Sequence, residues 1–178
     1  MYKYAQISED GRYRYVLTRR WGAGATVAWI MLNPSAADAE VDDPTIRRVI
    51  GFSKREGFGQ AVVLNLFAFR TPEPSELAAT ADPVGPENDK ILARFGGPNP
   101  HVTIAAWGAH YIARERWTAI APWFEDMQLF CLGTTKSGAP RHPLYLRRDT
   151  PLVPWISPTT RVGQASSQNA ASSNSEAP

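Results

Sequence analysis

The sequence predicts an α/β fold: a three-layer sandwich with a central, mainly parallel four-stranded sheet and an additional N-terminal β-hairpin. Short apolar runs alternate along the chain with segments of helical spacing, which is typical of strands joined by crossover helices. Each run is too short for a typical helix and is apolar throughout, as expected of strands that are covered on both faces. With 178 residues, the chain is long enough for one domain with a substantial core.

The hairpin is expected at residues 2–19, because the segments on either side of Asp10-Gly11 alternate between polar and apolar residues. The first helix is expected to begin after Asp43, a favourable N-cap, with Pro44 at its first position. The strands of the central sheet are expected at 27–32, 61–66, 101–107 and 127–132. Further helices are expected at 75–79, 87–95 and 109–120.

The domain is expected to span residues 1–155. The segment 156–178 consists mainly of Ser, Ala, Asn, Gln and Pro, and with almost no apolar side chains it is expected to be a disordered tail.

Composition excludes several classes of protein and site. A formal net charge of +2 is too small to predict nucleic-acid binding by itself, although Arg and Lys residues form local clusters. The single cysteine, Cys131, excludes an internal disulfide and a Cys-based zinc or iron–sulfur cage. No apolar run approaches the about 20 residues of a membrane-spanning helix, and no signal peptide is evident, so we expect a cytoplasmic protein without a membrane partner. We expect neither an organic cofactor nor a metal.

Three polar segments mark the ends of predicted strands: Asn33-Pro34-Ser35 follows 27–32, Asn65 lies near the end of 61–66, and Arg141-His142-Pro143 is in the loop after 127–132. Because the carboxyl ends of parallel strands lie along one edge of a sheet, residues far apart in the sequence can meet there. Taken singly, Asn-Pro is a common turn and a histidine in a loop is ordinary. Their shared position relative to the strands predicts a site.

Asn65 is the least expected of these residues, because it lies inside an otherwise apolar run that is suited to full burial. An unpaired buried amide costs about 1–3 kcal/mol, so a partner is required. That partner is either neighbouring loop backbone or the planar edge of a ligand, because an amide offers one acceptor and two donors.

Several of these residues also resemble known families. A bacterial and phage family of unknown function is closely similar over nearly all of residues 1–155. The resemblance is carried by Leu32-Asn33-Pro34-Ser35, Asp42-Asp43-Pro44-Thr45-Ile46-Arg47-Arg48, Asn65-Leu66-Phe67-Ala68-Phe69-Arg70, Gly85-Pro86-Glu87-Asn88-Asp89 and Ala106-Trp107-Gly108.

A wider resemblance is to the uracil-DNA glycosylase superfamily, whose members carry Asp-Pro or Asn-Pro after one strand, an Asn ending a later strand, and a His-Pro loop near the C-terminus. The corresponding positions are Asn33-Pro34, Asn65 and His142-Pro143. The resemblance implies a uracil-DNA glycosylase-like sheet, with Asn33 holding a water, His142 donating to the leaving base and Asn65 reading the base edge. Ser35 and Phe67 are further candidates for base binding, and Leu144 or Tyr145 for a wedge that fills the gap of a flipped base.

These observations predict a nucleobase-binding protein whose partner is a nucleic acid or a nucleotide, and whose reaction is hydrolysis of an N-glycosidic bond in DNA or a nucleotide. Asn33 is neutral where the strongest members of the superfamily have Asp, which lowers general-base power. The alternative is a non-catalytic module that binds modified bases or nucleic acid.

A third hypothesis is a metal-dependent nuclease, because Asp38, Glu40, Asp42 and Asp43 are close enough in sequence to hold Mg²⁺ or to supply a base. The structural interpretation of these acids is an N-cap and a favourable charge at the start of a helix.

Overall fold

The computed structural model describes residues 1–97 and 101–158. The tail expected at 156–178 lies outside the described residues from position 159 onward. The strands are β1 (Tyr2–Ile7), β2 (Arg14–Arg20), β3 (Thr26–Met31), β4 (Gln60–Asn65), β5 (Val102–Ala105), β6 (Leu129–Cys131) and β7 (Val153–Trp155). The helices are α1 (Pro44–Arg55), α2 (Asn88–Gly96) and α3 (Tyr111–Ile120), with 3₁₀ turns η1 (Pro74–Ala79), η2 (Ala121–Phe124) and η3 (Pro143–Tyr145).

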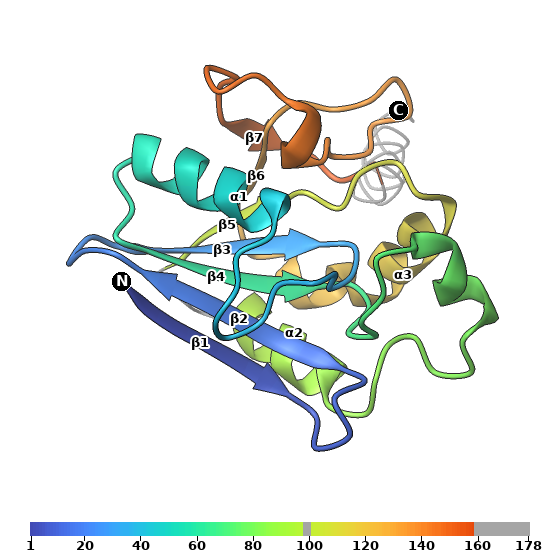
Figure 1. The fold of residues 1–178 in the computed structure, drawn as a ribbon. Helices are drawn as coiled ribbons and strands as arrows, with labels where there is room; N and C mark the ends of the chain where they lie inside the picture. The colour runs from blue at the N-terminus through green and yellow to red at the C-terminus, as the bar shows by residue number, and fades with distance from the viewer. Residues whose placement is uncertain (98–100, 159–178) are drawn as a thin grey trace, which may run out of the picture.

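The protein has an α/β fold built on one seven-stranded mixed sheet in the order β1-β2-β4-β3-β5-β6-β7 (Figure 1). Strand β3 pairs in parallel with β4 and β5, and β5 pairs in parallel with β6. The expected sheet of four strands is too small, because antiparallel strands extend it on both sides. The N-terminal hairpin is part of the sheet, since β2 pairs with β4 and covers an edge that would otherwise expose unpaired backbone groups.

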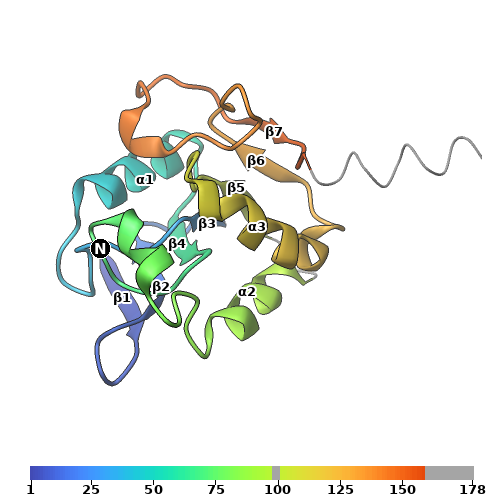
Figure 2. The ribbon, with the colours of Figure 1, turned by 90° about the vertical axis from the view of Figure 1, so that its right-hand side faces the viewer.

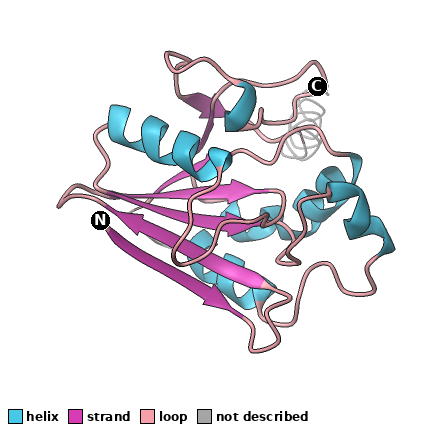
Figure 3. Cartoon of the chain, viewed as in Figure 1, coloured by secondary structure: helices cyan, strands magenta, loops and turns pink. Residues whose placement is uncertain are grey.

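Helices cover both faces of this sheet (Figures 2 and 3). Helix α1 lies on one face, where Trp29 is fully buried and its indole N–H donates to Ser53 Oγ at 3.0 Å. Helices α2 and α3 lie on the other face. There Trp107, Trp117 and Trp155 form a cluster with ring centroids 4.7 to 5.3 Å apart. Burial of such large rings contributes much of the apolar area in the core.

Strand β7 is absent from the sequence prediction, and Pro154 at its centre explains why. Proline has no backbone N–H and therefore argues against a strand, except at an edge. Strand β7 is such an edge strand and pairs antiparallel with β6 alone. Trp155 then anchors it in the tryptophan cluster.

The carboxyl ends of β3, β4 and β5 lie at one level of the sheet. The ladder continues just past these ends, because the N–H groups of Leu66 and Phe67 donate to Met31 and Leu32 at 2.8 and 3.0 Å. Likewise, Ala106 N–H donates to Ile30 O at 2.8 Å. Residues that follow these strands are therefore held close to one another. No helix among the described residues has the length and apolar character needed to cross a membrane.

Candidate functional site

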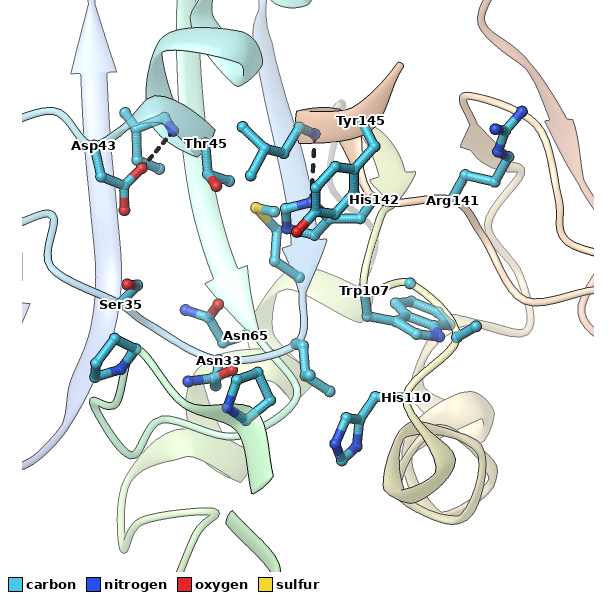
Figure 4. Close-up of a pocket in the computed structure, with 18 of the residues that line it drawn as sticks. Asn33, Ser35, Asp43, Thr45, Asn65, Trp107, His110, Arg141, His142 and Tyr145 are labelled. Carbon is cyan, nitrogen blue, oxygen red and sulfur yellow. Dashed lines mark hydrogen bonds between the residues drawn. The ribbon is translucent and has the colours of Figure 1, made fainter. Parts of the chain in front are cut away.

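A cavity of about 560 Å³ lies at this edge of the sheet, on the side of α1 (Figure 4). Its walls come from the ends of β3, β4 and β5, the start of α1 and the loop that contains η3. Among its lining residues are Asn33, Ser35, Asn65, His142, Leu144 and Tyr145. Six of the seven residues selected from the sequence therefore lie around one cavity.

The Asn33 amide is held in one orientation by backbone carbonyls. Its Nδ2 donates to Thr71 O at 2.8 Å and to Pro34 O at 3.0 Å, which uses both amide hydrogens. Thr71 N–H in turn donates to Pro34 O at 3.0 Å and locks the turn. Within the described residues, Asn33 Oδ1 accepts no hydrogen bond. The free end of this amide is thus an acceptor, as required for holding a water molecule.

The Asn65 side chain is 1% exposed, and neither its Oδ1 nor its Nδ2 has a hydrogen-bond partner in the described part of the chain. The backbone of Asn65, in contrast to its side chain, has a side-chain partner. Asn88, which is also buried, donates from Nδ2 to the carbonyls of Asn65 and Leu66 at 3.1 Å. Loop backbone among the described residues therefore does not satisfy the Asn65 amide, which leaves one acceptor and two donors without a protein partner at the cavity.

His142 lies on the opposite wall of the cavity and is in its neutral form at pH 7. Its Nδ1 accepts a hydrogen bond from Leu144 N–H at 3.3 Å, so the proton of the neutral ring is on Nε2. Burial lowers the pKa of the imidazole below 6.5, and the charge of Asp43 opposes this shift only in part. The ring therefore offers an N–H donor to a ligand.

Gly108 forms the turn after β5, beside the His142 loop. It adopts a positive φ of 79°, which favours glycine, whereas a Cβ at this position would make only an ordinary contact of 3.5 Å with His142 Cβ. Its N–H donates to Pro140 O at 2.9 Å. This contact joins the two sides of the cavity.

Arg48 of α1 holds the η3 loop in place. Its guanidinium donates from Nε to Pro143 O at 3.4 Å and from Nη2 to Leu146 O. It also stacks over Phe52, with Cζ 4.9 Å from the ring centroid. In the sequence Arg48 is only one member of a basic cluster, yet in the structure it fixes the segment that carries His142.

We expect Arg48→Met to loosen this loop and to lower the free energy of unfolding by about 1–3 kcal/mol, because two carbonyls lose a charged donor. Urea unfolding measures the stability, and hydrogen exchange of the Leu144 and Leu146 amides measures the loop. The control is Arg47→Met, since the Arg47 side chain is exposed and, among the described residues, donates to Asp42 O alone. Equal exchange in both variants would contradict this role of Arg48.

Of the remaining predicted residues, Ser35 and Tyr145 line the cavity and Phe67 does not. Ser35 lines it, and its hydroxyl has no partner among the described residues. Tyr145 is 82% exposed at the rim, and its ring centroid lies 5.8 Å from that of His142. Phe67, expected to stack on a base, is 6% exposed in the hydrophobic core and is not among the lining residues of the cavity. Its role in base binding stays a prediction.

Three of the four carboxylates of the acidic loop, those of Asp38, Asp42 and Asp43, have structural partners. Asp42 forms an ion pair with Arg19 at 2.6 Å. Asp43 Oδ1 caps α1 by accepting from Ile46 N–H at 2.8 Å. The N–H groups of Val41 and Glu40 donate to Asp38, which lowers the pKa of that carboxyl. Among the described residues, no group of acidic, His or Cys side chains is placed to hold a metal ion.

We expect Asp42→Asn to lower the free energy of unfolding by about 2 kcal/mol, because it leaves the fully buried Arg19 guanidinium without its counter-charge. The loss is the same with Mg²⁺ and with EDTA, as measured by urea unfolding. The exposed Glu40→Gln serves as the control. A loss that appears only with Mg²⁺ would instead favour a metal-binding loop.

Several lining residues were not anticipated. Trp107 is the second residue after β5, just as Asn33 is the second residue after β3. His110 is the N-cap residue of α3 and has a buried Nδ1 without a partner in the described structure. Arg14 lies at the start of β2 and is 3% exposed. A charged residue between Tyr13 and Tyr15 was the available signal for Arg14, because both neighbours are typical of a buried strand.

The structure is thus that of an α/β protein with a cavity at the carboxyl ends of parallel strands, the place where open α/β sheets commonly bind ligands. Residues 14–144 match the model of a family described as "Protein of unknown function (DUF1643)". The chain belongs to this family. No curated protein and no solved structure gives a significant match.

Proposed function

We propose that this protein binds a nucleobase in the cavity and hydrolyses the N-glycosidic bond that links the base to its sugar. The observation that carries the proposal is the Asn65 amide, buried and without a hydrogen-bond partner in the described residues, on the same cavity as Asn33 and His142. A planar base edge with one donor and one acceptor satisfies this amide. The likeness to uracil-DNA glycosylases rests on the sequence motifs alone.

The proposed chemistry follows from the orientation of the polar groups. Cleavage of the bond produces an oxocarbenium-like sugar and an anionic base, so it needs a water on one side and a donor on the other. Asn33 Oδ1 is the free acceptor for the water, and His142 Nε2–H is the donor for the leaving base. Asp43 also lines the cavity, and its carboxylate favours positive charge on the sugar.

The test is release of free base from oligonucleotides and nucleotides that contain uracil, hypoxanthine or mismatched bases. We expect release by the wild type and a large loss in Asn33→Ala, which removes the acceptor for the water. The control is Gln6→Ala, which removes an exposed amide from the edge strand β1, outside the lining residues of the cavity.

The alternative function is base binding without cleavage, and the neutral Asn33 favours it because an amide is a poor general base. In that case the wild type binds the base, releases none, and Asn33→Ala binds as well as the wild type. Absence of both binding and release would overturn the proposal.

A further inference from the structure

Arg14 is a second unsatisfied polar group on the cavity. Its side chain reaches the cavity from β2, and one end of the guanidinium is fixed because Nη1 donates to Ala37 O at 2.5 Å. Its Nε is buried and has no partner, and Nη2 makes no hydrogen bond within residues 1–97 and 101–158. The anchored end therefore leaves the opposite edge of the group free.

This free edge has a definite chemical preference. The Nε–H and Nη2–H bonds of an arginine are nearly parallel and fit two oxygens of one carboxylate or phosphate. A single carbonyl oxygen uses only half of this fork. The geometry at Arg14 is thus suited to an oxyanion rather than to a neutral acceptor.

Arg14 also forms no ion pair with the described residues, in contrast to Arg19 on the same strand. Arg19 is equally buried and pairs with Asp42 at 2.6 Å. No carboxylate of the described residues lies within 4.0 Å of Arg14. Burial lowers the pKa of Arg14 to about 10, opposed mainly by the attraction of Asp43, so the group is still charged at neutral pH. A buried charge without a partner is unfavourable, and an anionic ligand removes that penalty.

We propose that Arg14 binds an oxyanion carried by the ligand of this cavity, so that the natural ligand is an anionic nucleotide or an acidic base rather than a neutral nucleoside. The inference rests on the proposed function, because it places the oxyanion on the same molecule as the base read by Asn65. It narrows the substrate class to ligands with at least one negative charge next to, or on, the base.

The experiment is calorimetric titration of the wild type and of Arg14→Gln with uridine, uridine 5′-monophosphate, guanosine, guanosine 5′-monophosphate, xanthine and inorganic phosphate. The control variant is Arg20→Gln, because Arg20 is an exposed arginine on the same strand. If the oxyanion is a phosphate, the monophosphates bind at least tenfold more tightly than the matching nucleosides, and inorganic phosphate competes with them. If the oxyanion belongs to the base, xanthine binds at least tenfold more tightly at pH 8.5 than at pH 6. Either preference is lost in Arg14→Gln and kept in Arg20→Gln.

Two further measurements keep the proposal open to refutation. Should Arg14→Gln fail to fold, Arg14→Lys retains the charge without the fork, and a tenfold preference that survives in it overturns bidentate binding. In the wild type, phosphate or xanthine raises the melting temperature. No preference for any anionic ligand in the wild type would overturn the inference.

The outcome is separable from that of the proposed function, because binding is measured without base release. Anion binding with no cleavage of any nucleotide would contradict the proposed hydrolysis and support the oxyanion site at Arg14. Cleavage of neutral nucleosides at equal rates by the wild type and Arg14→Gln would contradict the oxyanion site at Arg14 and support the proposed hydrolysis.

Discussion

Asn65→Leu is expected to make the protein more stable and at the same time to weaken binding of the proposed base. Leucine is close to asparagine in size, and it removes an amide that is buried without a hydrogen-bond partner in the described structure. Such a group costs about 1–3 kcal/mol, so we expect the free energy of unfolding to rise by about 1–2 kcal/mol. Loss of a two-point contact with the base lowers affinity by about 10- to 100-fold. Urea unfolding and calorimetric titration measure the two effects.

The matched control is Thr103→Val, because Thr103 Oγ1 is likewise buried without a partner among the described residues, but the residue does not line the cavity. We expect this variant to gain stability for the same reason and to bind the base as the wild type does. A fall in stability of Asn65→Leu would show that the amide has a structural role. Such a result would remove the main support for base recognition.

Asn65 shows how much of this site can be predicted from the sequence, because a polar amide is unfavourable in the core. The apolar run around it predicts strand β4, and the amide violates that pattern. Sites of function are where local rules are expected to be broken. The grouping of Asn33, Asn65 and His142 was predictable because Asn33 follows β3, Asn65 ends β4 and His142 lies in the loop after β6. The carboxyl ends of these parallel strands share one edge of the sheet.

Arg14 and Phe67 mark the limit of this reasoning. Position after a strand predicts that a residue lies near the edge, but it does not predict the direction of its side chain. Phe67 is only two residues beyond Asn65, yet it packs in the core. Arg14 belongs to β2, which is antiparallel to β4, so the start of β2 reaches the edge where β4 ends. That contact follows from the sheet order, which the hairpin pattern alone does not reveal.

The supporting contacts were beyond sequence reasoning for a similar reason. Arg48 and Asn88 act through long-range hydrogen bonds to backbone carbonyls, of Pro143 in one case and of Asn65 in the other. Any exposed helix carries such polar residues, and their partners are fixed only by tertiary packing. The motif that contains Asn88 contributed to the family resemblance, and the structure gives it a role in holding the end of β4.

The second large effect is expected at His142, whose replacement by alanine removes the proposed donor for the leaving base. Loss of one preorganised donor of this kind lowers a rate by about 10²–10³-fold. We therefore expect base release by His142→Ala to fall by about that factor while uridine 5′-monophosphate still binds. His101→Ala is the control, because His101 packs against Phe95 away from the cavity. An unchanged rate in His142→Ala would remove this residue from the mechanism.

The same histidine makes stability depend on pH in a defined direction. Because burial lowers the pKa of folded His142 below its ordinary 6.5, the unfolded chain binds the extra proton first as the pH falls. Stability from this group is complete above pH 6.5 and decreases as the pH drops below that value. Protonation of Nδ1 in the folded state also breaks the hydrogen bond from Leu144 N–H, which releases the loop. Urea unfolding between pH 7.5 and 5 is expected to show this loss in the wild type and in His101→Gln but not in His142→Gln, whereas an equal loss in all three would assign the pH dependence to other groups.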